Sequence, residues 1–101
     1  MAISDVAEVR RELLERGYAP VTVAGGCMAP ALQDGQWVLV HREREPRRGD
    51  VALLDCRGTL ELHRLGFRLG PWWLHKGDAS PRWGLARRRE ILGVVTPPPL
   101  C

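Results

Sequence analysis

The sequence predicts a compact, mainly β fold with one N-terminal α-helix. Apolar residues follow a helical spacing only in the first segment of the chain. Beyond that segment they form short runs separated by turn residues, as expected for a series of short strands. The 11 glycines and 8 prolines among 101 residues also favour turns over a helical bundle. At roughly 100–200 residues per domain, this length indicates a single domain spanning residues 1–101.

We expect the helix over about residues 4–17. Ser4 can cap its N-terminus, because a serine hydroxyl accepts a hydrogen bond from the first backbone N–H groups of a helix. Gly17 is suited to the C-terminal end, and Pro20 prevents continuation. One apolar face of this helix is formed by Val6, Val9, Leu13 and Leu14.

The β core is expected over about residues 20–96, and a Pro-rich tail follows at 97–101. Turn residues at Asp55–Gly58 and Gly70-Pro71 each predict a hairpin. The runs that predict strands are Val21–Val23, Trp37–His41, Val51–Leu54, Thr59–Leu65, Phe67–Leu69, Trp72–His75 and Ile91–Val95.

Composition excludes several classes of protein. No run of 18 apolar residues is present, which argues against a membrane-spanning helix. The first residues contain no apolar segment typical of a secretory signal, so we expect a cytoplasmic chain. Three cysteines in a reducing compartment do not form a disulfide framework. The net charge of +3 is mild and does not by itself indicate a nucleic-acid partner.

The first candidate site is the glycine-rich segment that contains Cys27. Gly25 and Gly26 allow close approach of the backbone to a ligand and leave a thiol at the head of a turn. A thiol becomes a useful nucleophile when a neighbouring base or positive charge favours the thiolate. The alternative is a small buried cysteine that serves only packing, with Met28 beside it as a core residue.

Two further segments carry side chains able to assist such a nucleophile. His63 follows Leu62 on a predicted strand and could act as a general base, or it could be a hydrogen-bonded structural histidine. Asp78 follows a predicted strand in a Gly77-Asp78 turn. It could orient His63, or it could simply cap the turn.

The cysteines and histidines show no zinc-like spacing such as C-x₂-C. We therefore expect no metal site and no cofactor.

Taken in order along the chain, these segments resemble the clan of signal peptidases and LexA-type repressors. The resemblance covers about residues 21–96. The matching motifs are Gly26-Cys27-Met28-Ala29-Pro30, Leu32-Gln33-Asp34-Gly35, Trp37-Val38-Leu39-Val40, Gly49-Asp50-Val51, Leu62-His63-Arg64, Lys76-Gly77-Asp78 and Ile91-Leu92-Gly93-Val94-Val95. The resemblance implies the compact β fold of that clan and a peptidase site.

The resemblance also implies a role for each matched residue. The family nucleophile, normally serine, falls on Cys27. The general base, lysine in most bacterial members, falls on His63, as in the histidine subtype found in endoplasmic-reticulum and archaeal signal peptidases. Lys76 is the only lysine and aligns with the turn rather than with the base, which excludes a Ser-Lys type of dyad. Asp78 aligns with the turn aspartate, and a third catalytic member is left open.

Substrate binding and the oxyanion hole would fall on the same glycine-rich segment. Its matching residues are Gly25, Gly26, Cys27, Met28 and Pro30. Signal peptidases often place a hydroxyl two residues before the nucleophile, where this chain has Gly25. Any oxyanion hole would therefore depend on backbone N–H groups, including that of Cys27.

The function expected from these residues is a soluble, signal-peptidase-like endopeptidase that hydrolyses an extended peptide through Cys27 and His63. The alternative is an inactive module that keeps the peptide-binding groove. We expect a peptide or protein substrate and no nucleic acid, because residues 1–20 are too few for the DNA-binding domain of LexA-type repressors. A peripheral contact between Arg87–Arg89 and an anionic membrane surface stays open, as does the oligomeric state.

Overall fold

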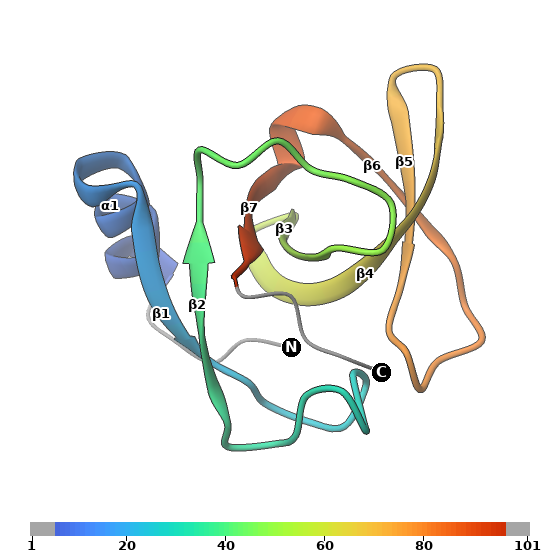
Figure 1. Ribbon diagram of the computed structural model, residues 1–101, viewed down its shortest axis with the longest axis horizontal. Coiled ribbons are helices and arrows are strands. Elements are labelled where there is room, and N and C mark those ends of the chain that lie inside the picture. The colour runs from blue at the N-terminus through green and yellow to red at the C-terminus, as the bar shows by residue number, and fades with distance from the viewer. Residues whose placement is uncertain (1–5, 97–101) are drawn as a thin grey trace.

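The computed structural model describes residues 6–96 (Figure 1). This part of the chain folds as one helix, seven strands and a short 3-10 turn. In chain order the elements are α1 (Val6–Arg16), β1 (Tyr18–Thr22), β2 (Trp37–His41), β3 (Val51–Cys56), β4 (Thr59–Leu69), β5 (Trp72–Lys76), β6 (Gly84–Arg87), η1 (Arg88–Glu90) and β7 (Ile91–Val95). The mainly β class with one N-terminal helix is confirmed.

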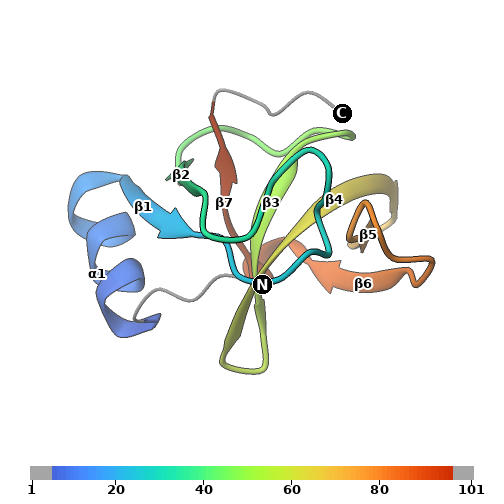
Figure 2. The same cartoon turned by 90° about the horizontal axis from the view of Figure 1, so that it is seen from below.

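The seven strands form one antiparallel sheet with the order β1-β2-β7-β3-β4-β5-β6. The sheet curls, and β4 bends strongly along its length (Figure 1). A second view shows the β3–β4 hairpin projecting from the body of the molecule (Figure 2). Strand β7, the last strand of the described chain, lies between β2 and β3 in the interior of the sheet.

The helix is present over Val6–Arg16, and its expected cap Ser4 lies outside the described residues. It ends where expected, because Gly17 has a φ of +82° and its N–H donates to the carbonyl of Leu13. Val9 and Leu13 are buried against the sheet. Leu14 was predicted on the same face but is 70% exposed, since one further residue turns its side chain about 100° away from the core.

The first strand begins earlier than predicted and contains Pro20. Proline lacks the N–H that a central strand would donate, which is why the sequence favoured a strand that starts after it. Within the described sheet β1 pairs only with β2, so it is an edge strand and tolerates the missing donor. The sheet edge, rather than the apolar run alone, decides where this strand begins.

Two predicted strands, Thr59–Leu65 and Phe67–Leu69, are one strand, β4. Its pairing with β5 shifts between Leu65 and Arg68, and this irregularity accommodates the bend. At Gly66 an added methyl group would lie 2.8 Å from the indole ring of Trp83. The glycine therefore marks a close ring contact inside a continuous strand.

Both predicted hairpins are present. Cys56 pairs with Thr59, which leaves Arg57 and Gly58 as a two-residue turn with φ values of 56° and 88°. Two positive φ angles are typical of the type I′ turn, whose twist matches that of paired strands. The second hairpin turns at Gly70-Pro71, where Gly70 has a φ of 60°.

Strand β6 was not predicted. Only Ala86 of its four residues is buried, so the segment lacks an apolar run. Its extended form is imposed by pairing with β5, in which Ala86 lies opposite Trp73. Such an edge strand is defined by its neighbour and not by its own pattern.

The core consists of two groups of buried side chains. The first lies between α1, the loop after β1 and the sheet, and its members are Val9, Leu13, Ala19, Val21, Val23, Met28, Leu32, Val38, Val40, Val51, Leu53, Leu60, Leu62 and Val95. The second lies between β3, β4, β5, β6 and β7, and its members are Ala52, Leu54, Leu65, Trp73, Ala86, Ile91 and Val94. No helix within residues 6–96 is long and apolar enough to cross a membrane.

Replacing Gly93 with alanine should destabilise the fold. The added methyl would lie 2.7 Å from a methyl group of Val40 and 2.8 Å from the carbonyl oxygen of His41. Because backbone cannot move aside cheaply, we expect a loss of about 1–3 kcal/mol in the free energy of unfolding, measured by urea denaturation. Gly26→Ala is the matched control, since its methyl would meet no atom within 4 Å. Equal stabilities for the two variants would contradict the packing at β7.

Candidate active site

The loop of residues 23–36 connects β1 to β2 and carries Cys27. Its neck is closed by hydrogen bonds from the N–H of Val23 to the carbonyl of Gln36 and from the N–H of Gly35 to the carbonyl of Val23. Its far end reaches the turn after β5 (Figure 1). There the carbonyl of Cys27 accepts a hydrogen bond of 2.8 Å from the N–H of Ala79.

Met28 anchors the same loop. Its side chain is 1% exposed, in the first core group, and its sulfur accepts a hydrogen bond of 3.4 Å from the N–H of Asp78. The expectation that Met28 binds substrate is not tested directly, but burial makes it a support for Cys27. The thiol of Cys27 itself is partly buried.

Gly77 is the position at which loop and sheet touch most closely. An added methyl group at Gly77 would lie 2.6 Å from the carbonyl oxygen of Cys27 and 3.0 Å from its Cβ. Real Cβ atoms do not approach so closely, so the backbone of Cys27 can lie here only against glycine. This contact gives a physical reason for the glycine of the Lys76-Gly77-Asp78 motif.

The strand register brings His63 to the same position. Arg64 pairs with Lys76 across β4 and β5. Continuing this antiparallel register by one residue sets His63 opposite Gly77, at the usual separation of neighbouring strands. The same glycine thus contacts the backbone of Cys27 and follows the strand that pairs with β4 next to His63, which brings these two segments of the chain into one region of the fold.

The ring of His63 has two polar neighbours. Its Nδ1 lies 2.9 Å from Nδ1 of His75, in a hydrogen bond between the two imidazoles. Its Nε2 lies 3.3 Å from a carboxylate oxygen of Glu61. Sequence reasoning assigned a role to neither neighbour. Strand alternation could have found Glu61, which is two residues before His63 on the same face, whereas His75 is found only from the register of β4 with β5.

Asp78 is held by Arg64. Nε and Nη2 of Arg64 donate to the two carboxylate oxygens of Asp78, both at 2.8 Å, in the bidentate geometry that arginine forms with carboxylates. Nη1 of Arg64 also donates to the carbonyl of Gly49. The carboxylate described beside His63 is that of Glu61. The catalytic role expected for Asp78 stays a prediction, while its observed contacts fix the turn that supports Cys27.

The predicted oxyanion residues form a tight turn. The N–H of Gly25 donates to the carboxylate of Asp34 at 2.9 Å, so this N–H forms a hydrogen bond within the loop. The carbonyl of Gly26 accepts from the N–H of Ala29, and Pro30 lies exposed at the turn. Their predicted role in holding an oxyanion stays a prediction.

Comparisons with known proteins identify the family of this chain. A sequence model described as Peptidase S24-like matches residues 2–95. The chain belongs to this family. A LexA repressor from Pseudarthrobacter chlorophenolicus is 33% identical over 97 residues, an alignment that covers 92% of this chain and 38% of the repressor. The chain thus spans well under half the length of this relative.

Membership of the S24-like family confirms the resemblance to LexA-type peptidases and supports a peptidase at the coarse level. The histidine subtype and the likeness to signal peptidases are finer statements that these matches do not reach. Within residues 6–96 no group of three histidine, cysteine or acidic side chains is arranged to hold a metal ion.

A hollow of about 300 Å³ adjoins the turn after β5 in this S24-like chain. Exposed aromatic rings of Phe67 and Trp83 form part of its wall. The guanidinium of Arg48 lies 3.9 Å from the centre of the Phe67 ring. The full lining is Arg48, Gly49, Arg64, Leu65, Gly66, Phe67, Lys76, Asp78 and Trp83.

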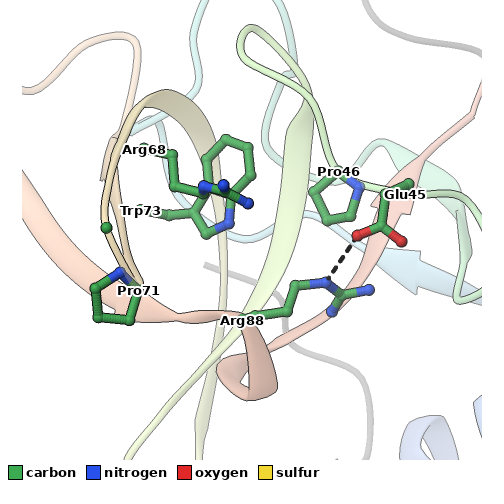
Figure 3. A pocket seen from close by; sticks show the side chains of 7 residues that line it. Glu45, Pro46, Arg68, Pro71, Trp73 and Arg88 are labelled. Carbon is green, nitrogen blue, oxygen red and sulfur yellow. Dashed lines mark ion pairs between the residues drawn. The ribbon is translucent and has the colours of Figure 1, made fainter.

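A second cavity, of about 270 Å³, lies by the β4–β5 hairpin (Figure 3). Figure 3 shows the side chain of Arg68 beside the indole of Trp73, and Arg88 paired with Glu45 at 3.5 Å. The lining is Glu45, Pro46, Arg68, Gly70, Pro71, Trp73 and Arg88. None of these residues belongs to the set around Cys27.

Burial shapes the protonation of the site. It lowers the pKa of His63 below its ordinary value of 6.5, and the Glu61 carboxylate partly opposes this effect. Burial also lowers the pKa of His75, and the neighbouring His63 adds to this. For Cys56 at the β3–β4 hairpin, burial and then the charge of Glu61 raise the pKa of the thiol from 9.0 to about 11.

Stability should therefore fall as the pH drops below about 6.5. In that range the unfolded chain protonates both histidines while the folded chain keeps them neutral, so the unfolded state binds more protons and is favoured. Above about pH 6.5 this contribution should vanish. We expect His75→Asn to show a weaker decline in unfolding free energy between pH 7.5 and 5.5 than the unaltered chain, measured with urea. Parallel declines would contradict the burial of neutral imidazoles.

Proposed function

We propose that this chain is the catalytic domain of an endopeptidase in which Cys27 is the nucleophile and His63 is the general base. The observation that supports the proposal is the junction at Gly77, where the backbone of Cys27 contacts the glycine and continuation of the β4–β5 register sets His63 opposite it. Membership of the S24-like family supports peptidase chemistry at the coarse level. Cysteine is the natural partner of histidine, because the pair can exist as thiolate and imidazolium.

The proposed reaction follows from these two groups. The Cys27 thiol passes its proton to Nε2 of His63, and the thiolate attacks the scissile carbonyl carbon. The tetrahedral intermediate collapses to a thioester as the C–N bond breaks, and His63 returns the proton to the leaving amine. Water then attacks the thioester while His63 takes its proton, which returns to the thiol as the acid product leaves.

Glu61 and the buried setting support this role of His63. The imidazolium formed during the reaction would lie beside the carboxylate of Glu61, 3.3 Å from Nε2, which stabilises the positive charge. Without substrate, burial favours the neutral ring, which is the form able to accept a proton. The base is therefore neutral at rest and stabilised when charged.

The surroundings suit an extended peptide. Strand β6 is an edge of the described sheet and pairs there only with β5. An extended segment can add to such an edge through backbone hydrogen bonds. The hollow bounded by Phe67 and Trp83 would take an apolar side chain, since both rings are exposed at its wall. A peptide or protein substrate is part of the proposal.

We expect iodoacetamide to alkylate Cys27 faster at pH 7 in the unaltered chain than in His63→Ala. Loss of the base should slow the reaction by about tenfold or more, because only the thiolate reacts and neutral His63 is the group that takes the thiol proton as the thiolate forms. Peptide mass spectrometry separates the cysteines. Cys56 serves as an internal control that labels slowly in both proteins, since burial raises the pKa of its thiol to about 11. An equal rate for Cys27 in both proteins would overturn the pairing.

The alternative function, an inactive peptide-binding module, is separated by cleavage. Incubation with a mixed peptide library should give products in the unaltered chain and none in Cys27→Ala. If peptides bind but no Cys27-dependent cleavage is found, the inactive module is favoured instead.

A further inference from the structure

We infer that His75 is a positioning residue that holds His63 in the form needed to accept a proton from Cys27. The inference rests on the proposed pairing of Cys27 with His63. It assigns to a neutral histidine the place that a carboxylate holds in a Ser-His-Asp triad.

The register of β4 and β5 places the two imidazoles next to each other. His75 pairs with Leu65 on β4, and His63 lies two residues from Leu65 on the same face. Their Nδ1 atoms are 2.9 Å apart. In a hydrogen bond between two imidazoles, one nitrogen must carry the proton and the other must accept it. The pair therefore couples the two tautomers, because a hydrogen on Nδ1 of one ring requires a bare Nδ1 on the other.

Only one arrangement of protons suits the proposed base. For Nε2 of His63 to accept a proton, Nδ1 must carry the hydrogen of the neutral ring. That hydrogen is then donated to Nδ1 of His75, which must be unprotonated. When His63 becomes an imidazolium it keeps the same Nδ1–H, so the bond to His75 persists through the whole cycle. A histidine protonated at Nδ1 in position 75 would instead repel the Nδ1–H of His63.

The fold keeps His75 neutral and fixed. The residue is 7% exposed, and burial disfavours its charged form. A methyl group added at Gly84 would lie 2.5 Å from Cε1 and 2.7 Å from Nε2 of His75, so the ring rests directly on the backbone of β6. Gly84 is paired with His75 in the register. The charged groups that act on His75, besides His63, are Glu61 on β4 and Glu90 on η1.

Cys27 alkylation in a double-mutant cycle tests the inference. His75→Leu should lower the rate at pH 7 by about tenfold, the scale known for removal of the hydrogen-bond partner of a metal-binding histidine. His75→Asn should restore most of the rate, because its amide oxygen can accept from Nδ1 of His63. In a His63→Ala background, His75→Leu should change nothing further. Gly84→Ala, which displaces the ring of His75, should behave as His75→Leu does.

A spectroscopic signature separates positioning from simple support of the fold. Long-range ¹H–¹⁵N NMR of the neutral protein should show the His63 proton on Nδ1, and His75→Leu should move it toward Nε2. Gly84→Ala provides the same reading if His75→Leu fails to fold.

Three results would overturn either the proposed function or the inference about His75. A rate unaffected by His63→Ala overturns the proposed function itself. A rate lowered by His63→Ala but kept in both His75→Leu and Gly84→Ala overturns only the inference. Equal losses from His75→Leu with and without His63 also overturn it, because the effect would then be structural.

Discussion

The close contact between the backbone of Cys27 and Gly77 is the constraint on which the site depends. It joins a loop that leaves one edge of the sheet to a turn that follows the fifth strand, and it leaves no room for a side chain. The hydrogen bond from Ala79 to the Cys27 carbonyl and the burial of Met28 hold the same junction. The position of Cys27 is therefore set by backbone contacts together with the buried side chain of Met28.

Arg64 and Asp78 support this junction from the side of the sheet. Their fork of two hydrogen bonds ties the turn to β4, next to His63 in the chain. The consecutive residues His63 and Arg64 point to opposite faces of β4 and have separate tasks. One carries the imidazole that we propose as base, and the other fixes the turn on which Cys27 rests.

The sequence was a good guide to elements with strong local patterns. Trp37–His41 and Ile91–Val95 were predicted with the bounds that the structure gives, because their apolar runs end at clear turn residues. Strand β6 was missed, since pairing with β5 and not its own composition makes it extended. Joining two predicted strands into β4 likewise depends on a bend that periodicity does not reveal.

The site, like the fold, could be predicted where local motifs mark it and not where strand pairing decides it. Cys27, His63 and Asp78 could be named from ordered motifs, but their neighbours depend on register. His75 meets His63 only because β4 and β5 align as they do. Asp78 was expected near His63, yet both its oxygens accept from Arg64, a contact between residues 14 positions apart that no local pattern encodes.

The order in which the ribosome delivers these residues has a consequence for the proposed chemistry. Cys27 emerges early, whereas Gly77, His75 and Gly84 all follow much later in the chain. A growing polypeptide therefore carries an ordinary thiol, without the contacts that surround it in the finished sheet. The pairing of Cys27 with His63 that we propose can therefore form only after the chain has been synthesised beyond Gly77.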